Sequence, residues 1–445
     1  MKKTKHKRAL IFIGLFGVAG AALILFSHAA ILNNIIEPEA GSAAGKVTSV
    51  TNSGASGGAY VQFDTCSTSG APGCPTNPVP PPLPTPSPTP SGKSFSSPLP
   101  ISEKKLILAQ TTGHALYPTF QQVKDNLSKF DSIPYDGVGL VDSSNHWQFG
   151  LSGGVYSVDE FRAGIQPYKD IAASLKKVKH NFYLIRIQHY GDLTQAKSKL
   201  IQNMSNLAEA AKDSGLEGII YDNEDYLNQS SWRNPATPPM FVPSSACPGQ
   251  TRENCKKIAY DIGIEVMKAT VAKWPTVKVL AMHSPAISVE SARSELMQGH
   301  SADYFLDLAN YDVLGAYTLG LGAGTINTQA VFIDGSESDY DVHSNAEIAR
   351  SLSARDTVLP RDSNLLSSVY KAEWSKQISQ ASALYSNTQN ASPDVWRNDI
   401  KNRKPLVDEY VWVYDENYDW IKMTGVSAGV YVPDSWRQAT IDGWR

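Results

Sequence analysis

The chain has 445 residues, of which 42% are hydrophobic, so it is long enough for two or three domains, or one large domain with appendages, around a sizeable core. Its formal net charge is −3, from 43 acidic and 40 basic side chains, and no long basic run follows residue 8. This balance argues against nucleic acid as a partner.

Residues 1–34 predict a targeting segment. Five basic residues precede an apolar or glycine run from 9 to 26 that is long for a signal peptide and just long enough to span a bilayer. Residues 27–29 (SHA) then resemble a small-x-small cleavage site. A cleaved signal and an uncleaved membrane anchor both stay open. Either one places the rest of the chain outside the cytoplasmic membrane, at the cell surface or secreted.

Residues 35–74 are small and polar and predict a short β-rich segment. Its stretches 36–41 (IEPEAG) and 54–63 (GASGGAYVQF) resemble the opening strands of carbohydrate-binding jelly-roll modules. Two strands alone are not independently stable, so we do not expect this remnant to bind sugar by itself. Residues 75–100 are proline-rich, which predicts a semi-rigid polyproline II linker.

The four cysteines form two local pairs in the sequence, Cys66 with Cys74 and Cys247 with Cys255. An even count with close partners in an exported chain favours disulfides. A metal site is the alternative, but the spacing lacks the C-x-x-C form.

From residue 101 onward, apolar runs alternate with segments of helical spacing. The runs that predict strands are 106–109, 137–141, 182–187, 218–221, 277–282, 313–317, 330–333 and 410–414. The helical patterns include 120–130, 158–178, 195–213, 256–273, 365–385 and 435–441. Eight such repeats predict an α/β fold, a (β/α)8 TIM barrel over 101–445. A doubly wound open sheet is the competitor, but residues 111–114 (TTGH) do not fit its glycine-rich phosphate loop.

In such a barrel the chemistry lies at the C-terminal ends of the strands. The fourth run ends in Asp222, Asn223, Glu224 and Asp225, and carboxylates this close shift one another's proton affinity. A solvated acidic loop is the plainer interpretation. Histidines, aromatic residues and acids end most other runs, as in a sugar site where rings stack on the substrate. The substrate-binding candidates are His114, Trp147, His189, Tyr190, Asn223, His283, Tyr317, Trp412 and Glu416.

The pair Asn223-Glu224 resembles the Asn-Glu pair of the large retaining glycosidase clan with (β/α)8 barrels, although Asp225 stands where that clan usually has proline. The resemblance implies Glu224 as the acid/base at the end of strand four. It implies Glu337, after the seventh run, as the nucleophile. Glu416 is the reserve candidate for this second carboxylate.

The sequence Asp222-x-Glu224 after Gly-Ile-Ile-Tyr also resembles the tail of the chitinase-type motif. That resemblance implies Glu224 as the acid and Asp222 as support for a substrate-assisted mechanism that does not need Glu337. Two catalytic carboxyl groups would lie about 5–5.5 Å apart in a retaining enzyme and roughly 6.5–9.5 Å apart in an inverting one.

The sequence therefore predicts an exported or surface-anchored glycoside hydrolase that cleaves a polysaccharide or glycan, acts as a monomer, and needs no cofactor or metal. A non-catalytic carbohydrate-binding or adhesion protein on the same fold is the main alternative. A metal-dependent hydrolase using His114, His189, His283 and Asp142 is a third, weakened because no H-x-H follows the first strand.

Overall fold

The computed structural model describes residues 47–51, 59–63, 95, 98–110, 117–148, 154–186, 192–222, 247–282, 312–353, 365–385, 392–415, 418–421 and 430–445. The chain divides into two units, Met1–Ser87 and Pro88–Arg445. In the first unit, β1 (Val47–Thr51) and β2 (Ala59–Phe63) form one antiparallel pair.

The predicted targeting segment, most of the proline-rich linker and the Cys66/Cys74 pair lie outside the described residues. No helix within the described ranges is long and apolar enough to cross a membrane.

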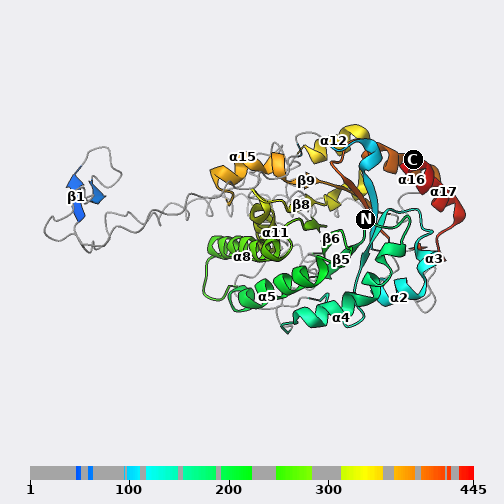
Figure 1. Ribbon diagram of the computed structural model, residues 1–445. Coiled ribbons are helices and arrows are strands. Elements are labelled where there is room, and N and C mark those ends of the chain that lie inside the picture. The colour runs from blue at the N-terminus through cyan, green and yellow to red at the C-terminus, as the bar shows by residue number, and fades with distance from the viewer. Residues whose placement is uncertain are drawn as a thin grey trace, which may run out of the picture. The chain divides into compact units, whose positions relative to one another are not determined.

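The second unit contains a parallel β-barrel surrounded by helices (Figure 1). Its strands are β3 (Lys105–Gln110), β4 (Gly137–Leu140), β5 (Phe182–Arg186), β6 (Gly218–Asp222), β7 (Lys278–Ala281), β8 (Val331–Asp334), β9 (Ser379–Gln380), β10 (Ser382–Tyr385) and β11 (Tyr410–Tyr414). Neighbours pair in the order β10-β11-β3-β4-β5-β6-β7-β8-β9, and all these pairs are parallel.

Strands β9 and β10 together form one position of the barrel. Only Ala381 separates them, and its N–H donates to the carbonyl of Asp334 on β8 at 2.8 Å. Because β9 pairs with β8 and β10 pairs with β11, the ring of strands closes. Counting β9 and β10 as one leaves eight strand positions from nine strands, which confirms the predicted parallel α/β barrel.

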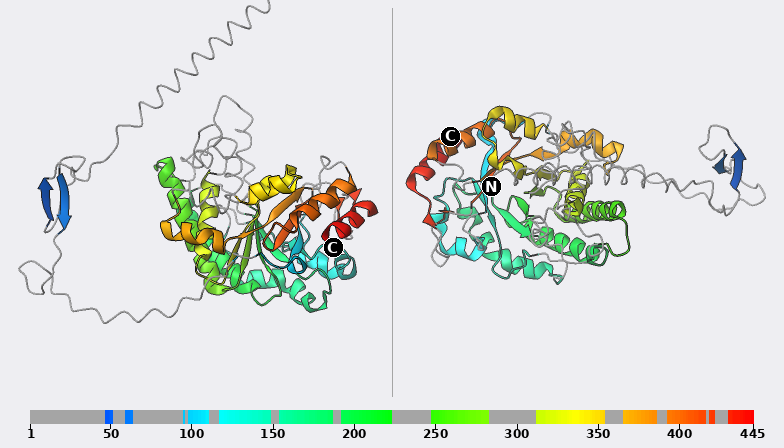
Figure 2. Two further views of the ribbon diagram at one scale, coloured as in Figure 1. Left: turned by 90° about the horizontal axis from the view of Figure 1, so that it is seen from above. Right: turned by 180° about the vertical axis from the view of Figure 1, so that it is seen from behind.

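The helices form a layer outside the strands (Figure 2). They are α2 (Phe120–Asp125), α3 (Leu127–Phe130), α4 (Val158–Lys169), α5 (Leu193–Ala211), α8 (Arg252–Lys273), α11 (Asp312–Thr325), α12 (Asn345–Leu352), α15 (Ser368–Gln377), α16 (Pro393–Arg403) and α17 (Asp434–Trp444). Short 3-10 turns are η2 (Ile101–Glu103), η3 (Ala172–Ser174) and η4 (Glu337–Asp341), and β12 (Tyr418–Asp419) pairs with β13 (Val430–Tyr431). Capping boxes at Thr119, Ser157 and Ser344 fix where α2, α4 and α12 begin.

The predicted sixth strand, 313–317, was wrong, because this segment belongs to helix α11. The helix is buried from Gly315 to Thr325, so it lacks the alternation of polar and apolar faces that marks a surface helix. Gly320 packs against α8 so closely that a Cβ there would lie 2.1 Å from the carbonyl oxygen of Tyr260. A short apolar run with glycines is ambiguous between a strand and such a helix.

The predicted helix 365–385 was also wrong in its second half. Helix α15 ends at Gln377, and β9 and β10 follow as the seventh strand position. Much of this strand is small or polar, and Ser382 donates to the buried carboxylate of Asp339. Such a strand lacks the apolar run that identifies the others. The predicted seventh run, 330–333, is consequently the sixth strand, β8.

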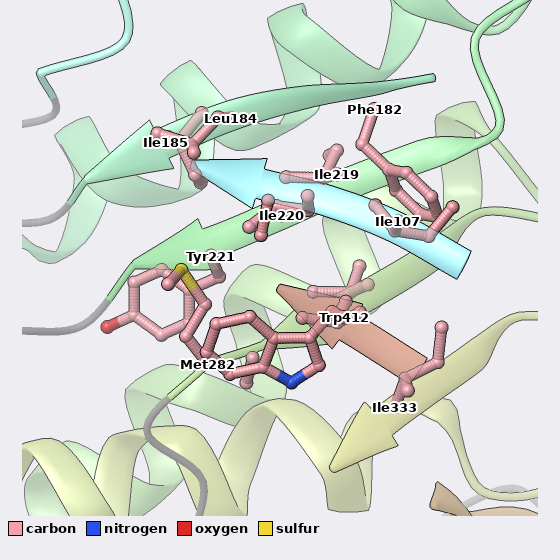
Figure 3. Packing of buried hydrophobic residues seen from close by; sticks show 14 of the residues in the cluster. Ile107, Phe182, Leu184, Ile185, Ile219, Ile220, Tyr221, Met282, Ile333 and Trp412 are labelled. Carbon is pink, nitrogen blue, oxygen red and sulfur yellow. The ribbon is translucent and has the colours of Figure 1, made fainter. Parts of the chain in front are cut away.

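Large apolar side chains fill the inside of the barrel, among them Ile107, Ile220, Ile333 and Trp412 (Figure 3). The indole N–H of Trp412 donates to the carbonyl of Gly335 at 2.6 Å, which joins β11 to the end of β8. The predicted Cys247–Cys255 disulfide is present just before and within the start of α8.

Candidate functional site

The fourth strand ends in a buried carboxylate, Asp222, which is 1% exposed. Its Cα is in register with Arg186, the last residue of β5, so both side chains lie on the same face of the sheet. That face also carries Ile220, which points into the barrel (Figure 3). Asp222 and Arg186 therefore lie on the inner face, at the C-terminal mouth.

Two groups from different parts of the chain meet at Asp222. The Tyr117 hydroxyl donates to its Oδ2 at 3.1 Å, and Arg186 Nε lies 3.7 Å from the same oxygen. Arg186 is held in turn by its backbone N–H, which donates to the carbonyl of Trp147 at 2.8 Å. The arrangement fixes the position of the carboxylate and surrounds it with a donor and a positive charge.

Trp147 is one of the predicted substrate-binding residues, and the structure brings it to this cluster. Its ring lies edge-on to that of Tyr117, with centroids 5.0 Å apart. Both rings are nearly buried, at 9% and 8% exposed. Trp147 therefore contacts Tyr117, and Tyr117 in turn donates to Asp222.

Three half-buried tyrosines form a second cluster at the mouth, which we call the tyrosine stack: Tyr340, Tyr385 and Tyr414. Tyr385 and Tyr414 end two neighbouring strands and are partners in register. Their rings are 5.3 Å apart and 19° from parallel, and Tyr340 of η4 stacks on Tyr385 at 5.2 Å. Partly exposed rings with nearly parallel faces are suited to contact the apolar face of a sugar.

Trp412 was predicted to contact substrate, but it is fully buried. It shares a strand face with Tyr414 two residues later, and its ring lies edge-on to Tyr340 at 5.7 Å. The indole packs beneath the tyrosine stack and supports it, so direct contact with a ligand is not its role in this structure.

Glu337, the predicted nucleophile, follows β8 and is half-buried at the start of η4. Ser336 before it has a left-handed backbone, with φ 51°, an uncommon conformation for a non-glycine residue. The expectation that Glu337 follows the seventh strand was wrong, because β8 is the sixth. The true seventh strand ends at Tyr385, and residues 386–392 (SNTQNAS) contain no carboxylate.

A buried polar network holds the segment that carries Glu337 and Tyr340. The carboxylate of Asp339 accepts from the Ser351 hydroxyl at 2.5 Å and from Ser382. The guanidinium of Arg403 donates to the carbonyl oxygens of Asp339 at 2.5 Å, Val342 at 2.6 Å, Ala383 at 3.0 Å and Asp399 at 3.3 Å. These bonds join η4 to β10 and α16.

Two other predicted positions lie outside the mouth. Tyr317 sits on α11 and is fully buried against Tyr221, so its predicted place on a strand was wrong for the reason given above. Asp142, part of the metal-dependent alternative, accepts from Tyr183 and lies against Gly164 of α4, on the helix side of the sheet. That orientation removes Asp142 from the barrel mouth.

The remaining predicted residues lie outside the described part of the chain: His114, His189, Tyr190, Asn223, Glu224, His283 and Glu416. Tyr117, Arg186 and Tyr385 are mouth residues that the sequence interpretation missed. Arg186 gave a signal, since it is a charged residue inside an otherwise apolar run of β5. Tyr385 gave none, because its segment was taken for a helix.

No family model matches the sequence, and no curated protein matches it. Solved structures similar to the chain include glycoside hydrolases. One is a GH18 chitinase from Pseudoalteromonas aurantia, at 15% identity over 72% of this chain and 97% of the chitinase, with a TM-score of 0.35. Another is a glycoside hydrolase family 5 enzyme from Prevotella bryantii B14, at 10% identity over 80% and 99%, with a TM-score of 0.40.

A 3-keto-D-glucoside 4-epimerase from E. coli is similar to the same degree, at 11% identity over 75% of this chain and 96% of the epimerase, with a TM-score of 0.35. A barrel fold does not determine the chemistry, which depends on the residues at the mouth.

Proposed function

We propose that the protein is a glycoside hydrolase that cleaves a polysaccharide or glycan at the C-terminal mouth of the barrel, either secreted or anchored outside the cytoplasmic membrane by residues 9–26. The observation that carries the proposal is the position of Asp222. It is an inward-facing carboxylate at the end of the fourth strand, bonded to Tyr117 and paired with Arg186, and it stands two residues before Glu224.

Glu224 is the proton donor in this proposal. Cleavage of a glycosidic bond requires an acid that protonates the leaving oxygen. Tyr117 and Arg186 fix the position of Asp222. Its carboxylate is therefore a negative charge at a defined position, two residues before Glu224 in the sequence. A negative charge beside a second carboxyl group favours the protonated form of that group, which is the form a proton donor needs.

The strand order favours the chitinase-type mechanism over the mechanism with carboxylates on strands four and seven. The seventh strand ends without an acid, whereas the Asp-x-Glu pair lies at the end of the fourth. In a substrate-assisted reaction a neighbouring group of the sugar attacks the anomeric carbon, so the substrate must carry such a group, for example a 2-acetamido group. Glu337 and Glu416 are the candidates if a second carboxylate attacks instead.

The tyrosine stack supports the assignment of a sugar ligand. Three partly exposed rings at the mouth offer an apolar face to a ligand. Aromatic side chains together with a few placed polar groups are the usual lining of a small-molecule site.

The test is release of reducing ends from a panel of polysaccharides by the full-length chain, with 2-acetamido polymers beside unsubstituted glucans and mannans. We expect Glu224→Gln to lower turnover by about 10²-fold or more while substrate binding is kept. Glu253→Gln, an exposed position on α8, is the matched control and should leave turnover unchanged. Unchanged turnover in Glu224→Gln would refute the proposal.

Two further outcomes separate the mechanisms and the alternative function. Cleavage restricted to 2-acetamido substrates, with Glu337→Gln still active, would support substrate assistance. Loss of activity in Glu337→Gln, with the fold intact, would instead identify a two-carboxylate enzyme. Sugar binding without any cleavage across the panel would favour the non-catalytic carbohydrate-binding or adhesion protein.

A further inference from the structure

We propose that a cavity on the outer wall of the barrel, between α3 and α17, is a second binding site that takes the carboxylate-bearing ring of an acidic sugar. This site is separate from the mouth and does not depend on the reaction proposed there. Its volume is about 460 Å³, which is within the range of small-molecule sites. It is lined by Lys129, Ser132, Trp420, Ile421, Tyr431, Asp434 and Arg437.

The positive charge of the cavity comes from two lining residues on different helices. Lys129 lies in the last turn of α3, and Arg437 lies in the first half of α17. Within the described parts of the chain neither forms an ion pair, and Arg437 donates from Nη2 to the carbonyl of Ser132 at 3.2 Å. Ammonium and guanidinium groups that are not already paired with carboxylates are available to an anionic ligand.

The acid nearest in sequence to Lys129 does not neutralise this charge. The carboxylate of Asp131 is engaged by three backbone N–H groups, those of Lys176, Lys177 and Val178, at 2.8–3.0 Å. Among the described residues that line the cavity, Asp434 is the one acid beside the two cations.

The cavity also has an apolar side. An inorganic anion has no apolar surface to place against it, whereas a sugar ring does. Tyr431 is 51% exposed, although it is a large aromatic residue. Trp420 and Ile421 are buried below and make an apolar floor. A pyranose ring has an apolar face for Tyr431, hydroxyls for Asp434 and Ser132, and, in a sugar acid, a carboxylate for Arg437 and Lys129.

A highly charged polymer such as a nucleic acid fits this site less well. The described part of the chain gives the cavity two cations with one acid beside them, and the whole chain carries a net charge of −3. A sugar acid, with one carboxylate and several hydroxyls on its ring, matches the two cations and the one acid of the cavity.

The experiment is isothermal titration calorimetry of the full-length chain with tetragalacturonate and with its methyl ester, which keeps the rings and removes the charge. We expect tetragalacturonate to bind at least ten-fold more tightly than the ester. The double variant Lys129→Gln/Arg437→Gln should weaken tetragalacturonate binding at least ten-fold, and Tyr431→Ala should weaken it several-fold. Lys268→Gln, an exposed lysine on α8, is the control and should bind as the wild type does.

Three results would overturn the proposal. Equal binding of the acid and the ester would show that charge is not recognised. Unchanged binding in the double variant would place the oligomer elsewhere, including at the mouth. Competition by inorganic phosphate together with full binding in Tyr431→Ala would identify a simple anion site without a sugar contact. Circular dichroism and thermal melting of each variant confirm that it is folded.

Discussion

The Tyr117 hydroxyl donates to Oδ2 of Asp222 at 3.1 Å, and this bond connects the segment before α2 to the end of the fourth strand. A hydrogen bond to a charged group contributes about 1.5–3 kcal/mol. Tyr117→Phe keeps the ring against Trp147 and removes the bond to Asp222. We expect turnover to fall about ten-fold or more with little change in KM, because the substituted group orients Asp222 and does not bind the sugar.

Tyr370→Phe is the matched control for that measurement, since Tyr370 lies on α15 in the outer layer of helices (Figure 2). Steady-state kinetics on the best substrate of the panel would distinguish the two variants. Equal kinetics for both would show that the bond to Asp222 has no part in the reaction.

Tyr385 should contribute to sugar binding through its ring. Tyr385→Ala removes one face of the tyrosine stack, and stacked aromatic contacts contribute about 0.5–1.5 kcal/mol beyond the area they bury. We expect oligosaccharide affinity to fall up to about ten-fold. Tyr385→Phe keeps the ring and should bind nearly as the wild type does. Tryptophan fluorescence or calorimetric titration checks this, and a loss as large in Tyr385→Phe would assign the effect to the hydroxyl.

Arg403 should be among the most important residues for stability. Its buried guanidinium donates to four backbone carbonyl oxygens that join η4, β10 and α16. Arg403→Met removes the guanidinium donor from all four acceptors, and removing one side of a buried charged network costs about 3–5 kcal/mol. Arg397→Met on the same helix removes only a surface ion pair with Asp394 and should cost less than about 1 kcal/mol. Urea unfolding of both variants measures the difference.

The N-terminal end of the barrel predicts a pH dependence of stability. Glu217 bonds to His180 and Lys278, and Lys278 also contacts Glu409. Burial alone would raise the pKa of Glu217, but the hydrogen bond from His180 and the charge of Lys278 outweigh it and hold that pKa below its ordinary value of 4.5. A lowered carboxyl pKa in the folded state stabilises the protein above pH 4.5, and this contribution is lost as the pH falls toward the folded-state value.

The destabilisation caused by Glu217→Gln should therefore be largest near neutral pH and shrink below pH 4.5. Urea unfolding of wild type and variant between pH 3 and pH 7 measures this difference, with the exposed Glu253→Gln as control. A difference that is constant over this range would mean that the effect is one of packing and not of charge.

Seven of the eight predicted barrel strands were found from short apolar runs, and these runs are buried on both faces in the structure, as in Ile219 and Ile220 of β6. Which segments form the sixth and seventh strands of the barrel was predicted wrongly. The run that includes Tyr317 has the composition of a buried strand but packs as a glycine-rich helix. The strand that ends at Tyr385 carries serines whose partners, such as Asp339, are distant in the sequence.

Sequence alone was enough to predict the parallel α/β barrel, the Cys247–Cys255 bridge and the acids that end the fourth strand, because each depends on residues that are close together along the chain. The folded structure was needed to show that Glu337 follows the sixth strand, that Trp412 is part of the core, and that Tyr117 and Arg186 meet at Asp222. Those features depend on pairing and burial between segments distant in sequence, and no local pattern of residues encodes which distant side chain will satisfy a buried polar group.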